Sequence, residues 1–132
     1  MLNILFLKSK NNFVPEEKRK IKNSIEEVAS RVINILDIKG IVNITVYPFV
    51  WYIRGKPWVG GVARSKEWVE LTIPPKIYLP DDLEGIVCHE LHHIARKYYY
   101  YTEIGEQRSL LNAIFSEGLA TTFEMEQVPQ RR

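Results

Sequence analysis

The sequence predicts an α+β fold, in which a small mixed or antiparallel sheet packs against one backing helix and two C-terminal helices. Three observations support this prediction. Apolar residues recur at helical spacing in three segments, β-branched or alternating runs lie between them, and glycine and proline mark the boundaries. At 132 residues, 45% of them hydrophobic and 26% charged, residues 1–132 are expected to form a single domain.

The N-terminal part is predicted to supply a strand, a long helix and a second strand. Residues 2–8 form a short apolar run typical of a strand, and Pro15 suits the first turn of a helix. Apolar residues at helical spacing extend this helix to Ile38, with Gly40 as a terminator. Residues 41–47 are β-branched and alternate, as expected for the second strand.

Further strands are expected between residues 49 and 73, with turns indicated at 55–57 and 60–61. Gly60 and Gly61 could equally lie at a sheet edge and allow close backbone approach there. The segment from Trp68 to Ile73 alternates, so its valine, leucine and isoleucine would share one face of the sheet. Three tryptophans of this region either line a cleft or fill the core, and packing in the core is the favoured prediction: Trp51, Trp58 and Trp68.

Two helices are predicted for the C-terminal part. Pro80 and two following aspartates indicate the start of the first, with an aspartate at its N-cap. This helix is expected to end in the tyrosine run at residues 98–101. The second helix would cover Arg108 to Gln127, with Pro129 beyond it.

Charge and cysteine content exclude several classes of protein. The net charge of +2 and the pI of about 8.6 are too mild to predict nucleic-acid binding, and the basic residues 18–22 are interpreted as a solvated helix face. Cys88 cannot form an intrachain disulfide and is interpreted as a small packing residue. The N-terminal apolar run is far shorter than the about 20 residues of a membrane span, so we expect no transmembrane segment and a cytoplasmic location.

All three histidines of the chain fall within residues 89–93. His89, Glu90 and His93 form a His-Glu-x-x-His pattern on a predicted helix, where positions i and i+4 share one face and can reach one metal ion. Glu90 would lie beside the pair and reach a water on that metal. His92 is interpreted as a flanking residue. The structural alternative is a solvated, histidine-rich helix turn.

A catalytic zinc site needs a third protein ligand besides an open position. No further histidine exists and Cys88 would point away, so any third ligand is a carboxylate. Glu117 is favoured because the interval after His93 leaves room for a second helix to return, and because Gly118 and Ala120 would permit close approach. The downstream candidates are Glu103, Glu106, Glu117, Glu124 and Glu126.

The segments His-Glu-Leu-His-His at 89–93 and Ser-Glu-Gly-Leu-Ala at 116–120 resemble the gluzincin class of zinc metallopeptidases. More narrowly, they are similar to a bacterial family of predicted zinc-dependent proteases that pairs these two motifs. The chain's size also resembles the minigluzincins, which are soluble single-domain relatives. The motif match spans about residues 84–124 and implies one zincin-like peptidase domain. It further implies that Glu90 is the general base and acid and that the Zn²⁺ ligands are His89, His93 and Glu117.

One position departs from the gluzincin pattern. Many gluzincins carry an aspartate one turn after the ligand glutamate, where it hydrogen-bonds a zinc-binding histidine, and here that position is Thr121. We expect weaker metal binding or activity unless Glu124 takes this role. The alternative function is a non-enzymatic zinc-binding or interaction domain on a peptidase-like scaffold, and a third is hydrolysis of a non-peptide amide.

The resemblance implies hydrolysis of peptide or protein substrates, with Glu90 taking a proton from the attacking water and passing it to the leaving amine. The tyrosine run and Arg108 are near enough in sequence to supply an oxyanion donor, but packing at a helix end is the favoured interpretation of the tyrosines. The substrate would add as a strand to a sheet edge, formed by residues 68–73 or 60–64. Because minigluzincins resemble zymogens, the tail at 128–132 is expected to occupy its own cleft or, in a homodimer, that of a neighbour.

Overall fold

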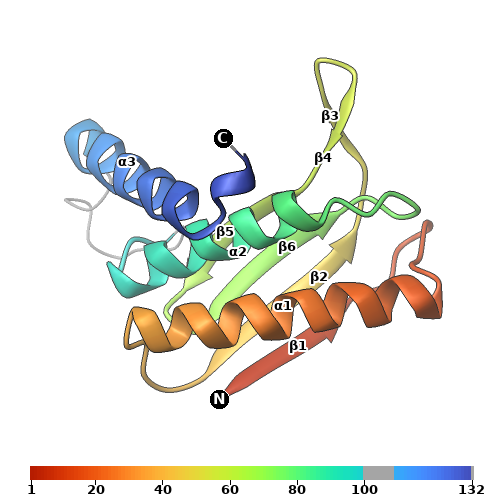
Figure 1. The fold of residues 1–132 in the computed structure, drawn as a ribbon, viewed down its shortest axis with the longest axis horizontal. Coiled ribbons are helices and arrows are strands. Elements are labelled where there is room, and N and C mark those ends of the chain that lie inside the picture. Colours follow the sequence, from red (N-terminus) through yellow and green to blue (C-terminus); the bar gives the residue numbers. More distant parts are fainter. Residues whose placement is uncertain (100–108, 132) are drawn as a thin grey trace.

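The computed structural model describes residues 1–99 and 109–131 and confirms the α+β class (Figure 1). The elements follow in the order β1 (Leu2–Phe6), α1 (Pro15–Ile35), β2 (Val42–Pro48), β3 (Trp51–Ile53), β4 (Lys56–Trp58), β5 (Gly60–Ser65), β6 (Trp68–Ile73), α2 (Pro80–Ala95), α3 (Leu110–Gln127) and the short 3-10 helix η2 (Pro129–Arg131).

The main sheet is mixed and has the strand order β1-β2-β6-β5. β2 pairs in parallel with both β1 and β6, whereas β5 pairs antiparallel with β6. Strand β5 therefore ends the sheet, next to α2. Strands β3 and β4 form a separate two-stranded hairpin.

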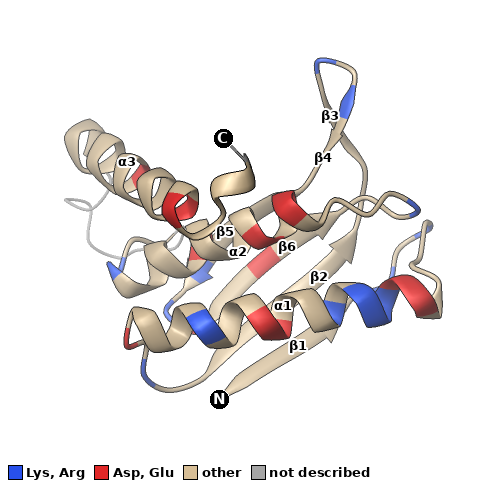
Figure 2. Cartoon of the chain, in the orientation of Figure 1, with Lys and Arg blue, Asp and Glu red and all other residues tan. Residues whose placement is uncertain are grey.

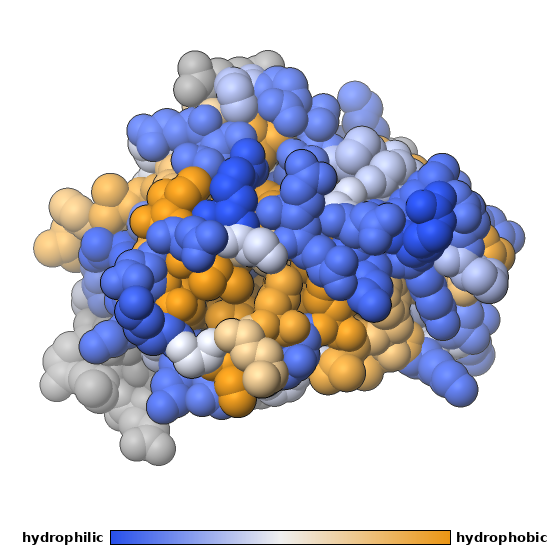
Figure 3. Space-filling model, turned by 60° about the horizontal axis from the view of Figure 1, so that its bottom comes forward, coloured by the Kyte–Doolittle hydropathy of each residue, from blue (hydrophilic) through white to orange (hydrophobic). Residues whose placement is uncertain are grey.

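The core lies between the sheet and the helices α1 and α2, which cover the same face of the sheet (Figure 1). The alternation predicted for β6 is confirmed, since Val69, Leu71 and Ile73 are all buried. On the face of the molecule that Figure 3 shows, apolar side chains form a surface patch with hydrophilic side chains around it. The buried side chains between the sheet and the helices hold α2 next to β5.

Several predicted boundaries were wrong for identifiable reasons. Helix α1 ends at Ile35 because the chain turns through the left-handed residues Asp37 and Gly40, with φ of 52° and 84°. The N-cap of α2 is Leu79, which has no side-chain cap bond, and the two aspartates lie within the first turn. Ser109, by contrast, caps α3 by accepting a hydrogen bond from the Asn112 N–H.

The predictions for glycine and tryptophan between residues 49 and 73 need two corrections. The turn falls at Arg54–Gly55, where both residues have positive φ, whereas Gly60 and Gly61 lie inside β5. The tryptophans do not fill the core: Trp51 and Trp68 are exposed and Trp58 is only partly buried. Among the described residues, no helix is both long and apolar enough to cross a membrane.

Candidate metal centre

Helix α2 carries the histidine pair on the side that faces the sheet edge and α3. Its stripe of Leu83, Val87 and Leu91 is fully buried and anchors the helix in the core. His93 and Glu90 are also buried, with only 4% and 5% of their surfaces exposed. Polar side chains this deep need specific partners, since an unpaired buried polar group is costly.

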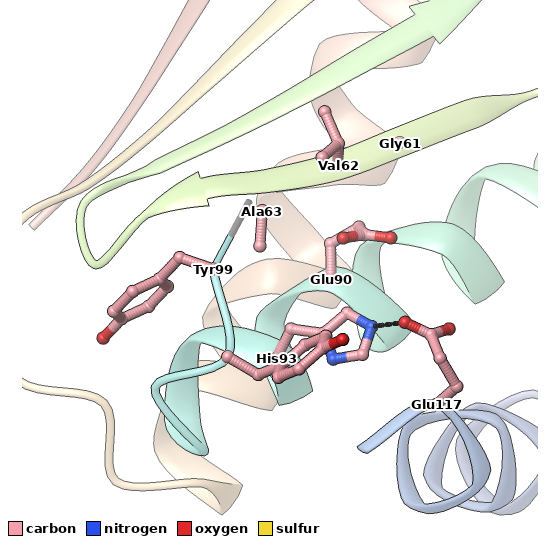
Figure 4. A pocket seen from close by; sticks show the side chains of 8 residues that line it. Gly61, Val62, Ala63, Glu90, His93, Tyr99 and Glu117 are labelled. Atoms are coloured by element: carbon pink, nitrogen blue, oxygen red, sulfur yellow. Dashed lines mark ion pairs between the residues drawn. The ribbon is translucent and has the colours of Figure 1, made fainter. Parts of the chain in front are cut away.

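Helix α3 supplies such a partner. The two oxygens of Glu117 lie 3.0 Å from His89 Nε2 and 2.8 Å from His93 Nε2, and Figure 4 shows the contact with His93. The structure therefore brings together the three residues that the sequence suggested as zinc ligands. Ala120 is buried as expected, whereas Gly118 faces open space and is not needed for the approach of the helices.

The contacts of His89 show that this donor set fits a cation. Its Nε2 faces Glu117, and its Nδ1 lies 3.1 Å from Oε1 of Glu124. A neutral imidazole has one N–H and can donate to only one of the two carboxylates, whereas an imidazolium, with two N–H groups, could donate to both. A metal cation held by both Nε2 atoms and Glu117 would leave the Nδ1–H of His89 to donate to Glu124, as is usual for metal-bound histidines.

Glu90 is also close to the histidines. Its carboxylate and the ligand nitrogens of His89 and His93 lie within 4.8 Å of one another, so distance alone would permit Glu90 as a ligand. However, the Nε2 atoms of both histidines contact Glu117, and Glu90 points towards β5 (Figure 4). Burial raises the pKa of Glu90 to about 7, close to what a general base needs at neutral pH.

Glu124 makes the contact with a histidine that the gluzincin pattern assigns to an aspartate at the position of Thr121. Thr121 is exposed, whereas the Glu124 side chain is only 16% exposed and contacts His89 from the next turn of α3. From the sequence, Glu124 was only one possible residue for this role. His93 has no equivalent support, because its buried Nδ1 has no hydrogen-bond partner among the described residues.

The remaining candidates lie away from this centre or outside the described residues. The ring of His92 packs against Phe123, with ring centroids 5.2 Å apart, and Cys88 is fully buried as predicted. Glu126 is exposed on α3. The candidates at 100–108 fall outside the described residues: Tyr100, Tyr101, Glu103, Glu106 and Arg108.

The edge strand beside the centre is β5, so the alternative edge at residues 68–73 is wrong because β6 is paired on both sides. A cavity of about 280 Å³ lies between β5 and His93, lined by Gly61, Val62, Ala63, Glu90, His93, Tyr98, Tyr99 and Glu117 (Figure 4). A second hollow of about 300 Å³ lies on the His89 side, next to Trp58 and Val59. The centre therefore opens onto a surface that runs along β5.

Packing at the helix end was the favoured prediction for Tyr98, with an oxyanion donor as the alternative. Its ring does pack on His93, with centroids 5.3 Å apart, but it also lines the cavity. Helix α2 ends at Ala95, and Lys97 has a φ of 60°, which turns the chain back over the helix. The backbone N–H of Tyr98 then donates to the carbonyl of His93. Tyr98 reaches the cavity because the chain turns at Lys97, and the sequence did not predict that turn.

Gly61 allows β5 to lie close to Glu90, and Gly61→Ala is expected to destabilise the fold by about 1–3 kcal/mol. An added Cβ would lie 2.7 Å from Cγ1 of Ile86 and 3.1 Å from Cγ of Glu90. The matched control is Gly118→Ala, where the Cβ meets open space on a helix and is expected to stabilise by about 0.5–1 kcal/mol. Urea unfolding measures both values. Equal effects of the two substitutions would contradict the close packing of β5 on α2.

The model of a family described as Predicted Zn-dependent protease (DUF2268) matches residues 21–132, which include both helices of the centre. Neither the curated proteins nor the solved structures gave a match. The match covers most of the chain, and the chain therefore belongs to this family of predicted zinc-dependent proteases.

Proposed function

We propose that the chain is a gluzincin-type zinc metallopeptidase whose zinc ligands are His89, His93 and Glu117. One observation carries the proposal: the Nε2 atoms of both histidines converge on a single carboxylate from another helix, directly beside a sheet edge. Two imidazoles and a carboxylate with an open side form a common catalytic zinc set. The family description supports zinc and proteolysis independently of this geometry.

The residues would divide the work as follows. A zinc ion held by this set would supply a Lewis acid that polarises the scissile carbonyl and acidifies a water. Glu90, buried between α2 and β5, accepts the proton of the attacking water and delivers it to the leaving amine. Tyr98 lines the same cavity and is the described side chain best placed to donate a hydrogen bond to the developing oxyanion.

The substrate would be an extended peptide segment lying along β5. No other described strand pairs with the outer edge of β5, so its backbone groups can pair with an added strand. Hollows lie on both sides of the histidine pair, one towards Tyr98 and one towards Trp58. Side chains on either side of the scissile bond could therefore enter them.

Two measurements test this function. Metal analysis should find about one zinc per chain, and the His89→Ala/His93→Ala double variant should lose it. Incubation of the zinc-loaded protein with a peptide library should then yield cleavage products. Zinc binding without cleavage would favour a non-enzymatic zinc-binding or interaction domain, and cleavage of small amides alone would favour a non-peptide substrate.

We further propose that the C-terminal tail restrains activity. Val128 is fully buried, η2 packs against α2 and α3, and Gln130 donates a hydrogen bond to Asp81 on the first turn of α2. These contacts hold the tail near the Trp58 hollow, whose lining includes Asp82.

Removal of residues 129–132 is expected to raise peptidase activity or to change the oligomeric state. Truncation after Val128 keeps the buried side chain, so the variant should unfold at nearly the temperature of the full chain. Activity and sedimentation velocity are compared with those of the full chain. If both remain unchanged while folding is intact, the tail has no restraining role.

A further inference from the structure

The hairpin of β3 and β4 projects away from the sheet and the helices (Figure 1). It exposes large apolar side chains: Phe49 is 41% exposed, Trp51 49%, Tyr52 67% and Ile53 50%. An isolated two-stranded hairpin is only marginally stable in water, and a row of aromatic contacts supports this one. The rings of Phe49 and Trp51 lie 4.8 Å apart, and those of Trp51 and Trp58 lie 6.5 Å apart.

Apolar side chains stand on both faces of this hairpin. Successive strand residues point to opposite faces, yet Trp51, Tyr52 and Ile53 are all about half exposed or more. A groove on a partner protein would cover one face and leave the other in water. A medium that surrounds the tip, such as the interfacial region of a bilayer, would cover both, and tryptophan and tyrosine are enriched there.

The charges at the tip of the hairpin are positive, whereas Asp82 and Glu124 line the hollow beside Trp58 at its base. Residues 41–66 contain no aspartate or glutamate, and Arg54 and Lys56 stand at the tip (Figure 2). At the base, Lys10 and Lys76 line a hollow together with Val50. Glu16, on the first turns of α1, is paired with Arg19 at 2.5 Å. Exposed aromatic side chains bordered by cations are complementary to anionic lipid headgroups over an apolar interior.

We propose that residues 49–56 form an attachment site for the surface of an anionic lipid bilayer. Trp51, Tyr52 and Ile53 enter the interfacial region, while Arg54 and Lys56 contact the headgroups. The chain would lie on the membrane through this hairpin without crossing it. The inference does not depend on the proposed function, because it uses no residue of the metal centre.

Vesicle sedimentation of the full chain tests the proposal. The chain should bind vesicles of phosphatidylcholine mixed with phosphatidylserine, bind phosphatidylcholine alone much more weakly, and lose affinity as salt is raised. Trp51→Ser/Tyr52→Ser should lower the partition coefficient by about tenfold or more, from the lost apolar burial. Arg54→Gln and Lys56→Gln should each lower it by about fivefold. Tryptophan fluorescence should shift to the blue on binding.

Matched controls distinguish vesicle binding through the hairpin from nonspecific adsorption of exposed apolar or basic side chains. Leu110→Ser/Leu111→Ser removes two side chains that are 77% and 74% exposed on α3, and should leave vesicle binding unchanged. Lys39→Gln/Lys66→Gln removes two charges at other loops and should have little effect. Failure to bind anionic vesicles, or equal losses in the control variants, would overturn the proposal. So would a dimer that forms without lipid and dissociates in Trp51→Ser/Tyr52→Ser, since the hairpin would then bind a second copy.

Discussion

Glu90→Gln is expected to lower kcat by about 10²–10⁴-fold while the protein keeps one zinc per chain. Glutamine has nearly the same volume and fits the buried position between α2 and β5, but its amide cannot accept the proton of the attacking water. Because burial disfavours the charged carboxylate and raises its pKa to about 7, the neutral amide should not destabilise the fold. Single-turnover peptide cleavage, metal analysis and urea unfolding measure the three expectations.

The matched control for this variant is Glu84→Gln, on the same helix and outside both hollows beside the centre. It should leave cleavage and zinc content unchanged. The ligand atoms of Glu90, His89 and His93 lie within 4.8 Å of one another, so the alternative to test is that Glu90 itself binds the zinc. If Glu90→Gln loses zinc and Glu117→Gln keeps it, then Glu90 is the ligand and the roles proposed for the two glutamates are wrong.

The local part of the centre was predictable because its geometry is that of one helix. Residues i and i+4 share a helix face whatever the rest of the fold, so His89 and His93 could be paired from spacing alone. Glu117 comes from another helix, and its distance to the histidines depends on how α3 packs on α2. Among five candidate carboxylates, the interval after His93 and the small neighbouring residues favoured Glu117, and the motif resemblance strengthened that choice. The structure places Glu117 between the two Nε2 atoms.

The predictions that failed depend on the rest of the fold. Gly60 and Gly61 were equally compatible with a turn and with close backbone approach at a sheet edge, and tertiary packing decides for the second, since a Cβ at Gly61 would lie 2.7 Å from Ile86. The tryptophans are core residues by size, yet the 49–58 hairpin carries two of them outside the sheet. Sequence periodicity does not encode where a hairpin projects, because neither face of this one packs on the core.

Glu124→Ala is expected to weaken zinc binding by about 10–100-fold, the usual cost of losing the carboxylate behind a metal-bound histidine. Glu124 lies 3.1 Å from Nδ1 of His89 and is the described carboxylate that contacts the far side of that ring. Glu124→Gln keeps a hydrogen-bond acceptor but removes the charge, so its effect should be smaller. Competition with a zinc chelator of known affinity measures each dissociation constant.

Glu126→Ala removes an exposed carboxylate two residues along the same helix and is the matched control, expected to leave zinc affinity unchanged. Comparing zinc affinity with the stability of the zinc-free protein distinguishes two possible roles of Glu124. A structural role for Glu124 would lower the free energy of unfolding of the zinc-free protein, whereas an orienting role lowers zinc affinity more than it lowers that stability. Equal zinc affinity in Glu124→Ala and Glu126→Ala would mean that His89 needs no carboxylate partner. In that case Glu124 would not replace the aspartate that the gluzincin pattern has at the position of Thr121.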